Sequence, residues 1–195
     1  MRIVLYVEGE TEQAFKRHLK AFLDDIADRD EKQKVGLVTR TDTHRHRLQR
    51  NVARDLGDPQ CLGVVVLVDV YPEFGSPEAV REHYGGCGGQ RFRAHCALHD
   101  FEAWLLPYWQ RVFEQAGRRP PKNPKWLNPE TVNVDKPPSR VLREDVFTGK
   151  PGYQKTVHAA RILEGQDLRV AAEASPQLKL FLNTLLEFAG YETRI

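Results

Sequence analysis

Apolar and polar positions along the first half of the chain fall into blocks that predict strands and helices in turn. Residues 2–7 and 62–69 are apolar runs of the kind found in buried parallel strands. Shorter runs at 35–38 and 91–98 predict two further strands. Apolar residues at helical spacing predict helices over about 10–27, 44–56 and 78–84. Strands that alternate with helices predict a doubly wound α/β fold with a mostly parallel, four-stranded, Rossmann-like sheet.

The second half of the chain is predicted to be a helical extension. A helix is expected to include Trp104, Leu105 and Leu106, and prolines then crowd the segment between Gly117 and Pro138. Further helices are predicted near 139–144, 153–164 and 176–189, the last with Ser175 as its N-cap. The predicted organisation is an α/β core at 1–116, a Pro-rich basic connector at 117–138 and a helical extension at 139–195. The extension is expected to pack on the core within one structural domain.

Composition excludes several classes of protein. The net charge of +2 over 195 residues excludes a strongly basic coat for DNA but permits a local basic face. The sequence has no apolar run of 18 residues and no secretory signal, so we expect a cytoplasmic protein with no membrane partner. Three scattered cysteines argue against a disulfide framework.

Acidic residues follow three of the predicted strands. Glu8 follows the first strand, Asp69 ends the third, and Asp100 and Glu102 follow the fourth. In a doubly wound sheet, ligands bind outside the carboxyl ends of the strands. If strands one and three are neighbours and strand four flanks strand three, these carboxylates converge. Carboxylates gathered in one cleft repel each other unless a cation neutralises them, which predicts Mg²⁺, with Mn²⁺ as a substitute.

The residues after Glu8 have two interpretations. Gly9 permits a tight turn, and the N–H groups that open the next helix, with Thr11 beside them, suit a phosphate. Alternatively, Thr11 is only a helix cap, and Glu12 is an acid in a first helical turn, which the helix dipole favours whatever the function.

A basic stripe lies on the predicted helix at 44–56. Arg47, Arg50 and Arg54 share one face, opposite an apolar stripe that includes Leu48 and Val52. This face is predicted to contact the phosphates of a nucleic acid. The alternative is the solvated outer face of an amphipathic helix.

The segment 7–12 after a first strand, with a later strand that ends in Asp69, resembles the TOPRIM superfamily. That superfamily includes catalytic domains of topoisomerases and primases, ribosomal-RNA maturases and OLD-type nucleases. The chain is most similar to a small bacterial TOPRIM-like family of unknown function. The similarity runs through residues 67–71, 100–106, 138–140 and 152–155, and so covers nearly the whole chain.

The resemblance implies roles for individual residues. Glu8 would be a metal ligand or general acid/base, and Asp69 the first acid of an Asp-x-Asp motif whose second acid is replaced by Tyr71. Glu73 or, preferably, Glu102 would supply the missing carboxylate. Lys155 would offset charge on a phosphate with help from Arg140, although both also fit the pattern of solvated helix charges. Four residues are expected beside the metal ligands: Glu12, Tyr71, Glu73 and Asp100.

The sequence thus predicts a Mg²⁺-dependent phosphodiesterase acting on DNA or RNA, in phage defence or in nucleic-acid repair or processing. Its metal would be held by Glu8, Asp69 and Glu102. One alternative is a non-catalytic TOPRIM-like module that binds an ATPase subunit or nucleic acid, which the tyrosine at position 71 favours. Another is a maturase of structured RNA. The sequence does not fix the oligomeric state.

Overall fold

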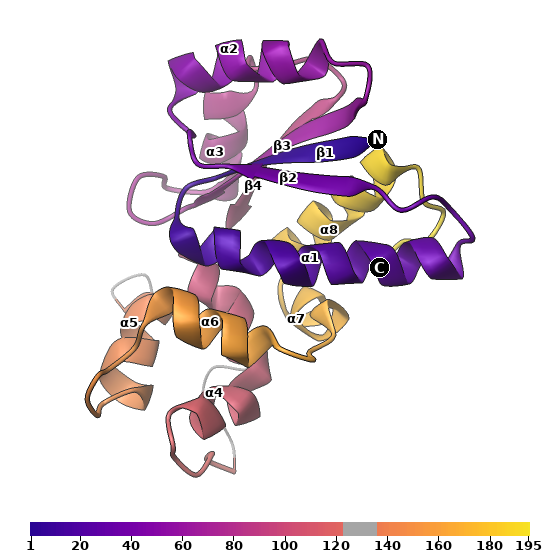
Figure 1. Ribbon diagram of the computed structural model, residues 1–195. Coiled ribbons are helices and arrows are strands. Elements are labelled where there is room, and N and C mark those ends of the chain that lie inside the picture. The colour runs from indigo at the N-terminus through magenta and orange to yellow at the C-terminus, as the bar shows by residue number, and fades with distance from the viewer. Residues whose placement is uncertain (123–135) are drawn as a thin grey trace.

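The computed structural model describes residues 1–122 and 136–195, in which helices cover both faces of a parallel sheet (Figure 1). Among these residues, all strand pairs are parallel and the strand order is β2-β1-β3-β4. The doubly wound α/β fold predicted from the alternating pattern is confirmed. The strands are β1 (Arg2–Val7), β2 (Gly36–Arg40), β3 (Cys61–Asp69) and β4 (Phe92–Ala97).

The helices of the first half lie where the apolar spacing predicts them, and those of the second half differ in detail. The predicted helix at 104–106 is a 3₁₀ helix, in which Pro107 provides no N–H for a regular α-helical bond. The segment near 139–144 combines a short α-helix with a π-helical turn, and α7 was not predicted. The helices are α1 (Glu10–Arg29), α2 (Arg45–Leu56), α3 (Pro77–Tyr84), η1 (Phe101–Tyr108), α4 (Trp109–Gln115), α5 (Pro138–Val141), η3 (Leu142–Val146), α6 (Lys155–Leu163), α7 (Leu168–Ala174) and α8 (Pro176–Ala189). Residues 123–135 of the Pro-rich connector lie outside the described residues.

Two apolar cores form because successive residues of a strand point to opposite faces of the sheet. Ile3 and Leu5 of β1 pack with α1, α8 and the other C-terminal helices on one face. Val4 packs with Leu48 and Val52 of α2, and with α3, on the other. Helices on both faces explain why β1 and β3 are nearly continuous apolar runs.

Helix α8 covers part of the sheet and is not an appendage at its edge. Ser175 accepts a hydrogen bond from the backbone N–H of Leu178 at 3.4 Å, and Gly190 ends the helix with a positive φ of 71°. A Cβ atom on Gly63 of β3 would lie 2.3 Å from the Phe188 ring. The missing side chain at position 63 therefore lets α8 approach the sheet closely.

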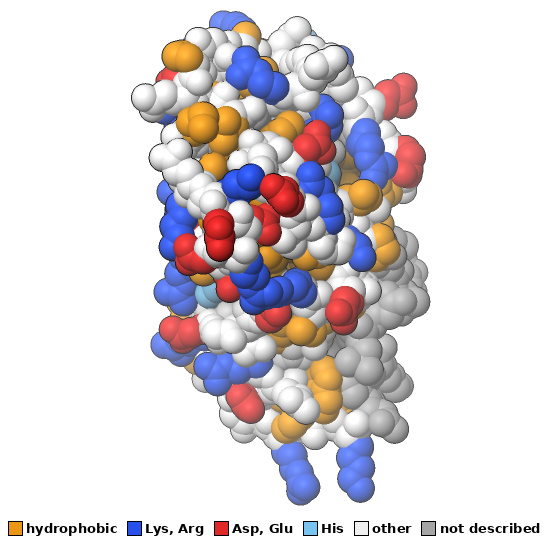
Figure 2. Space-filling model, turned by 90° about the vertical axis from the view of Figure 1, so that its right-hand side faces the viewer, with side chains coloured by type: hydrophobic (Ala, Val, Ile, Leu, Met, Phe, Trp, Pro, Cys, Tyr) orange, Lys and Arg blue, Asp and Glu red, His pale blue; other side chains and the backbone are white. Residues whose placement is uncertain are grey.

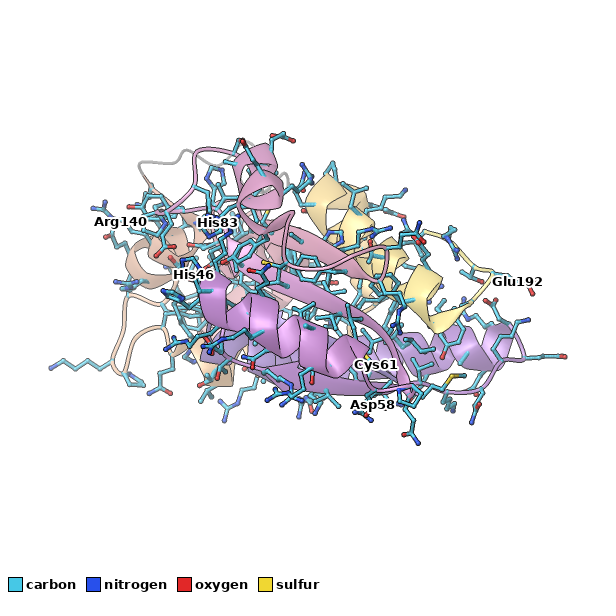
Figure 3. All side chains as sticks on the ribbon, turned by 90° about the horizontal axis from the view of Figure 1, so that it is seen from above. His46, Asp58, Cys61, His83, Arg140 and Glu192 are labelled. Carbon is cyan, nitrogen blue, oxygen red and sulfur yellow. The ribbon has the colours of Figure 1, made fainter. Side chains whose placement is uncertain are left out.

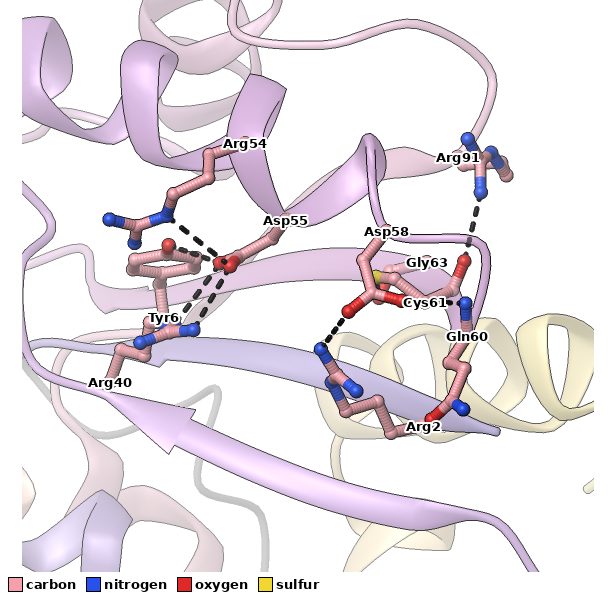
Figure 4. Close-up of polar contacts among 10 residues, drawn as sticks. All are labelled: Arg2, Tyr6, Arg40, Arg54, Asp55, Asp58, Gln60, Cys61, Gly63 and Arg91. Carbon is pink, nitrogen blue, oxygen red and sulfur yellow. Dashed lines mark hydrogen bonds and ion pairs between the residues drawn. The ribbon is translucent and has the colours of Figure 1, made fainter.

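A buried carboxylate fixes α2 against the sheet (Figure 4). Asp55, at the end of α2, is 5% exposed and accepts a hydrogen bond from the Tyr6 hydroxyl of β1 at 2.6 Å. Arg40 of β2 donates to both oxygens of the same carboxylate, at 3.1 and 3.0 Å. Such a two-pronged arginine contact adds geometric specificity. The helix with the predicted basic stripe is thus tied to two neighbouring strands.

Charges of both signs are interspersed on the side of the molecule from which β1 starts (Figure 2). Hydrophobic side chains appear there in small groups between them. This face does not carry the single-sign field expected of a surface that attracts a polyanion. The opposite end of the strands carries the predicted site.

Candidate functional site at the carboxyl edge of the sheet

Glu8 and Asp69 lie together at the carboxyl edge of the sheet. Their strands β1 and β3 are neighbours, and the strand order reverses between them. The backbone N–H of Asp69 donates to Glu8 Oε2 at 3.2 Å. Glu8 is exposed, whereas Asp69 is half-buried and its Oδ1 atom is buried, so the pair meets solvent mainly through Glu8. This is the position at which doubly wound sheets bind ligands.

A turn after β4 carries two more carboxyl groups into the interior. His99 adopts a φ of 69°, in the left-handed region that residues other than glycine seldom occupy, and its carbonyl accepts from the Tyr71 N–H at 2.6 Å. Asp100 is 4% exposed and accepts a hydrogen bond from the Ser139 N–H at 3.1 Å. Glu102 is fully buried. The turn therefore ties the segments after β3 and β4 together and fixes both acids.

Lys155, the first residue of α6, brings a cation to these acids. Its Nζ lies 3.3 Å from Glu102 Oε1, and its side chain is half-exposed. Burial alone would lower the pKa of Lys155, but the charges of Glu102, Asp100 and Asp69 outweigh it and raise that pKa. The ammonium group therefore stays protonated and links the interior acids to Asp69.

The two interior acids share an unusual electrostatic environment. Burial, then the charge of Asp100, raises the pKa of Glu102 to about 7, against the opposing effect of Lys155. Burial also raises the pKa of Asp100, although its bond from Ser139 lowers it. Carboxyl groups whose pKa is shifted by burial and by a specific charged partner are typical of functional sites.

Tyr153 packs beside the same acids. Its buried hydroxyl has a pKa raised well above the usual value, first by burial and then by the charges of Glu102 and Asp100. The ring lies 5.3 Å from the Phe147 ring and 5.7 Å from the His158 ring, which fix its orientation. Tyr153 thus forms a rigid wall of the acid cluster.

Other predicted site residues lie near this edge but do not join the cluster. Tyr71 is 45% exposed, and Glu73 lines a groove that also contains Glu8. Arg140 forms an ion pair with Glu144, 2.6 Å from Nε to Oε1. Gly9 has extended dihedral angles, φ −127° and ψ −179°, which any residue adopts. The side chains of residues 10–14, including Thr11 and Glu12, lie outside the described part of the structure.

The arginines of α2 face solvent, as the stripe pattern predicts. Arg47, Arg50 and Arg54 are exposed and line a hollow of about 360 Å³. Arg47 Nε lies 3.1 Å from Asp42 Oδ1. Their contact with phosphate stays a prediction.

The donor set at this edge suits Mg²⁺ in part. Among the side chains that the structure describes, which leave out residues 10–14 and 123–135, no group of three or more His, Cys, Asp or Glu is arranged to hold a metal ion. Mg²⁺, however, is commonly held by one or two carboxylates together with waters and substrate phosphates. The pair of an exposed Glu8 and a half-buried Asp69 fits that pattern, whereas Glu102 is buried against Lys155.

Two features of the site have no signal in the sequence pattern. Tyr153 enters through tertiary packing of the segment before α6, and only its place beside Lys155 in the 152–155 motif singles it out. The positive φ of His99 has no clear signal either: histidine adopts such a φ more often than most residues other than glycine, but still only rarely.

One family model matches residues 7–186, and its description is Domain of unknown function (DUF4276). No curated protein and no solved structure matches the chain. Within the described residues, no helix is long and apolar enough to cross a membrane.

Proposed function

The chain belongs to the DUF4276 family, and we propose that it is a metal-dependent phosphodiesterase acting on DNA or RNA. The observation that carries the proposal is the contact of Glu8 with Asp69 at the point where strand order reverses, next to a protonated lysine. Paired carboxylates with an adjacent cation are the parts that phosphodiester hydrolysis needs. The TOPRIM resemblance stays a prediction and agrees with this choice.

Glu8 and Asp69 would hold the metal ion, Mg²⁺ or Mn²⁺. Glu8 is exposed and Asp69 is half-buried, and the hydrogen bond from the Asp69 N–H holds Glu8 toward its neighbour. A divalent ion there would supply Lewis-acid polarisation of a phosphate and lower the pKa of a bound water. The exposed position of Glu8 leaves room for the waters and substrate oxygens that complete such a shell.

Lys155 would act on the phosphate. Its side chain is half-exposed and its ammonium group lies 3.3 Å from Glu102 Oε1, so the lysine would pair with Glu102 and meet a ligand from the solvent side. Asp100 and Glu102 keep the lysine protonated and hold it near Asp69. A fixed positive charge of this kind stabilises the negative charge that develops on a phosphate in the transition state.

The alternative is a module of the same fold that binds nucleic acid or an ATPase subunit without catalysis. The observation that favours it is at position 71, where an exposed tyrosine stands two residues after Asp69 and offers no carboxylate for a second ion. A link to phage defence or to RNA maturation stays a prediction, and the choice of substrate below separates DNA from RNA.

The proposal is tested by nicking of supercoiled plasmid and cleavage of a labelled structured RNA, each with Mg²⁺, Mn²⁺ or chelator. We expect metal-dependent cleavage that Glu8→Gln and Asp69→Asn abolish and that Lys155→Met slows by roughly 100-fold or more. Glu173→Gln, which removes an exposed acid on α7, is the matched control and should cleave normally. A folded wild-type protein that cleaves neither substrate refutes the proposal and supports the binding module. Cleavage that persists in chelator refutes the metal.

A further inference from the structure

Two joined hollows run from Glu8 along helix α2. The first is a groove of about 520 Å³ between α2, α3 and the segments that follow β1, β2 and β3. The second, of about 360 Å³, lies along α2. Both are lined by the ion pair of Asp42 and Arg47, so the two hollows adjoin there, and we refer to them together as the track. The track therefore begins at Glu8, one of the two proposed metal ligands, and ends near Arg54.

The charges along the track change from acidic to basic with distance from the metal site. Near Glu8 the wall carries Glu73 and, beyond it, Arg45. Farther along α2 the wall carries Arg47, which pairs with Asp42, then Arg50, and then Arg54, whose Nε lies 3.8 Å from the buried Asp55 carboxylate. The hydrogen bonds of Asp55 to β1 and β2 fix the helix that carries these arginines. A polyanion is the ligand that such a row of cations attracts.

The groove also has an exposed aromatic ring on a rigid support. The ring of His83 lies 4.7 Å from the Tyr84 ring and 5.4 Å from the Phe74 ring, both in edge-on contact. Tyr84 is buried, and its hydroxyl donates to the Thr43 carbonyl at 3.1 Å. Figure 3 places His83 and His46 at the same end of the molecule, and both line the groove. An exposed ring held in this way can stack on an unpaired base.

We propose that this track binds one single strand of nucleic acid, with backbone phosphates on the arginines of α2 and a base on His83. The inference rests on the proposed function, since the phosphodiester bond of the strand that lies beside Glu8 and Asp69 would be the bond that is cut. From Arg45 to Arg54 the helix rises by about 14 Å, enough for roughly two or three phosphates of an extended strand. A duplex is excluded because its bases are paired and already stacked, and so are not free to cover His83.

The test is binding of labelled single-stranded DNA and RNA oligonucleotides by fluorescence anisotropy, in chelator, between about 50 and 200 mM salt. The first variant replaces Arg47, Arg50 and Arg54 with glutamine. Its matched control makes the same charge change at three exposed sites elsewhere, Arg29→Gln, Arg161→Gln and Lys179→Gln. Circular dichroism confirms that both variants fold.

We expect the α2 variant to bind at least about tenfold more weakly, with a logarithmic salt dependence shallower by about 2, the value for three lost phosphate contacts on a single strand. The control variant should keep the wild-type slope. His83→Ala should weaken binding by about tenfold at every salt concentration without changing the slope, because stacking carries no charge. Unlabelled single strands should displace the probe, and duplex should not.

Equal slopes for the α2 variant and its control overturn the track, as does a wild-type protein that binds no single strand at low salt. A duplex that competes as well as a single strand, with no loss in His83→Ala, overturns the single-stranded ligand. Binding is measured without metal, so this outcome is independent of cleavage. A protein that binds through the track and cuts nothing contradicts only the proposed function, whereas a protein that cuts but has no arginine-dependent slope contradicts only the track.

Discussion

Glu102→Gln removes a buried negative charge while it preserves the shape of the side chain. Glu102 is fully buried, and its pKa is raised from 4.5 to about 7, first by burial and then by Asp100. Lys155 opposes the shift without cancelling it. The ionised carboxylate therefore destabilises the folded chain, and we expect the glutamine variant to be the more stable protein near neutral pH.

The magnitude and its sign follow from the shift in pKa. The folded state binds the proton of Glu102 more tightly than the unfolded state, so the wild-type protein loses stability as the pH rises from about 4.5 to about 7. Each pKa unit corresponds to about 1.4 kcal/mol, which makes the full loss about 3 kcal/mol above that range. Below pH 4.5 the loss is absent. Glutamine does not titrate, so the variant escapes the loss.

Urea denaturation of both proteins in chelator, at about pH 5 and about pH 8, measures the effect. Relative to wild type, Glu102→Gln should gain about 2 to 3 kcal/mol in free energy of unfolding between these conditions. Glu173→Gln, an exposed acid, should show no such pH-dependent difference. A Glu102→Gln variant that loses stability relative to wild type on going to pH 8 would refute the reasoning, because it would mean that the ion pair with Lys155 outweighs burial.

Three further substitutions test the packing that positions the site, each by chemical denaturation. Asp55→Ala should lower the free energy of unfolding by about 3 kcal/mol, because it removes the buried hydrogen-bond acceptor of Tyr6 and Arg40. A loss below about 1 kcal/mol would mean that these bonds do not fix α2 to the sheet. Gly63→Ala should lower it by roughly 1 to 3 kcal/mol through overlap with Phe188, and Phe188→Leu should restore part of the loss. Ser175→Ala should lower it by about 1 kcal/mol by removing the cap of α8, and an unchanged value would deny that cap a role.

The sheet and its flanking helices could be predicted because their signals are local. The apolar run at 62–69 is short, rich in valine and ends in a charge, which favours a buried strand over a buried helix. Helix α8 begins at Pro176 after a capping serine and ends before Gly190, as these start and stop residues predict. By contrast, η1 is buried on every side, so its apolar pattern has no period from which to tell a 3₁₀ helix from an α-helix.

Only those site residues that follow directly on a predicted strand could be placed from the sequence. Glu8 and Asp69 meet because parallel strands present their carboxyl ends at one edge, a rule that needs no coordinates. The pairing of Lys155 with Glu102 joins residues from α6 and η1, and no local pattern encodes that contact. The groove with His83 likewise depends on how α3 packs beside α2, which the sequence shows only as two separate helices.

Binding of Mn²⁺, followed by loss of its free electron paramagnetic resonance signal, tests most directly whether this edge is a metal site. The wild-type protein should take up Mn²⁺ and release it to excess Mg²⁺, because both ions accept the same oxygen ligands. Glu8→Gln and Asp69→Asn should each weaken uptake by more than about tenfold, and Glu173→Gln should not. A wild-type protein that leaves the Mn²⁺ signal unchanged, or variants that bind as tightly as wild type, would contradict the assignment of Glu8 and Asp69 as its ligands.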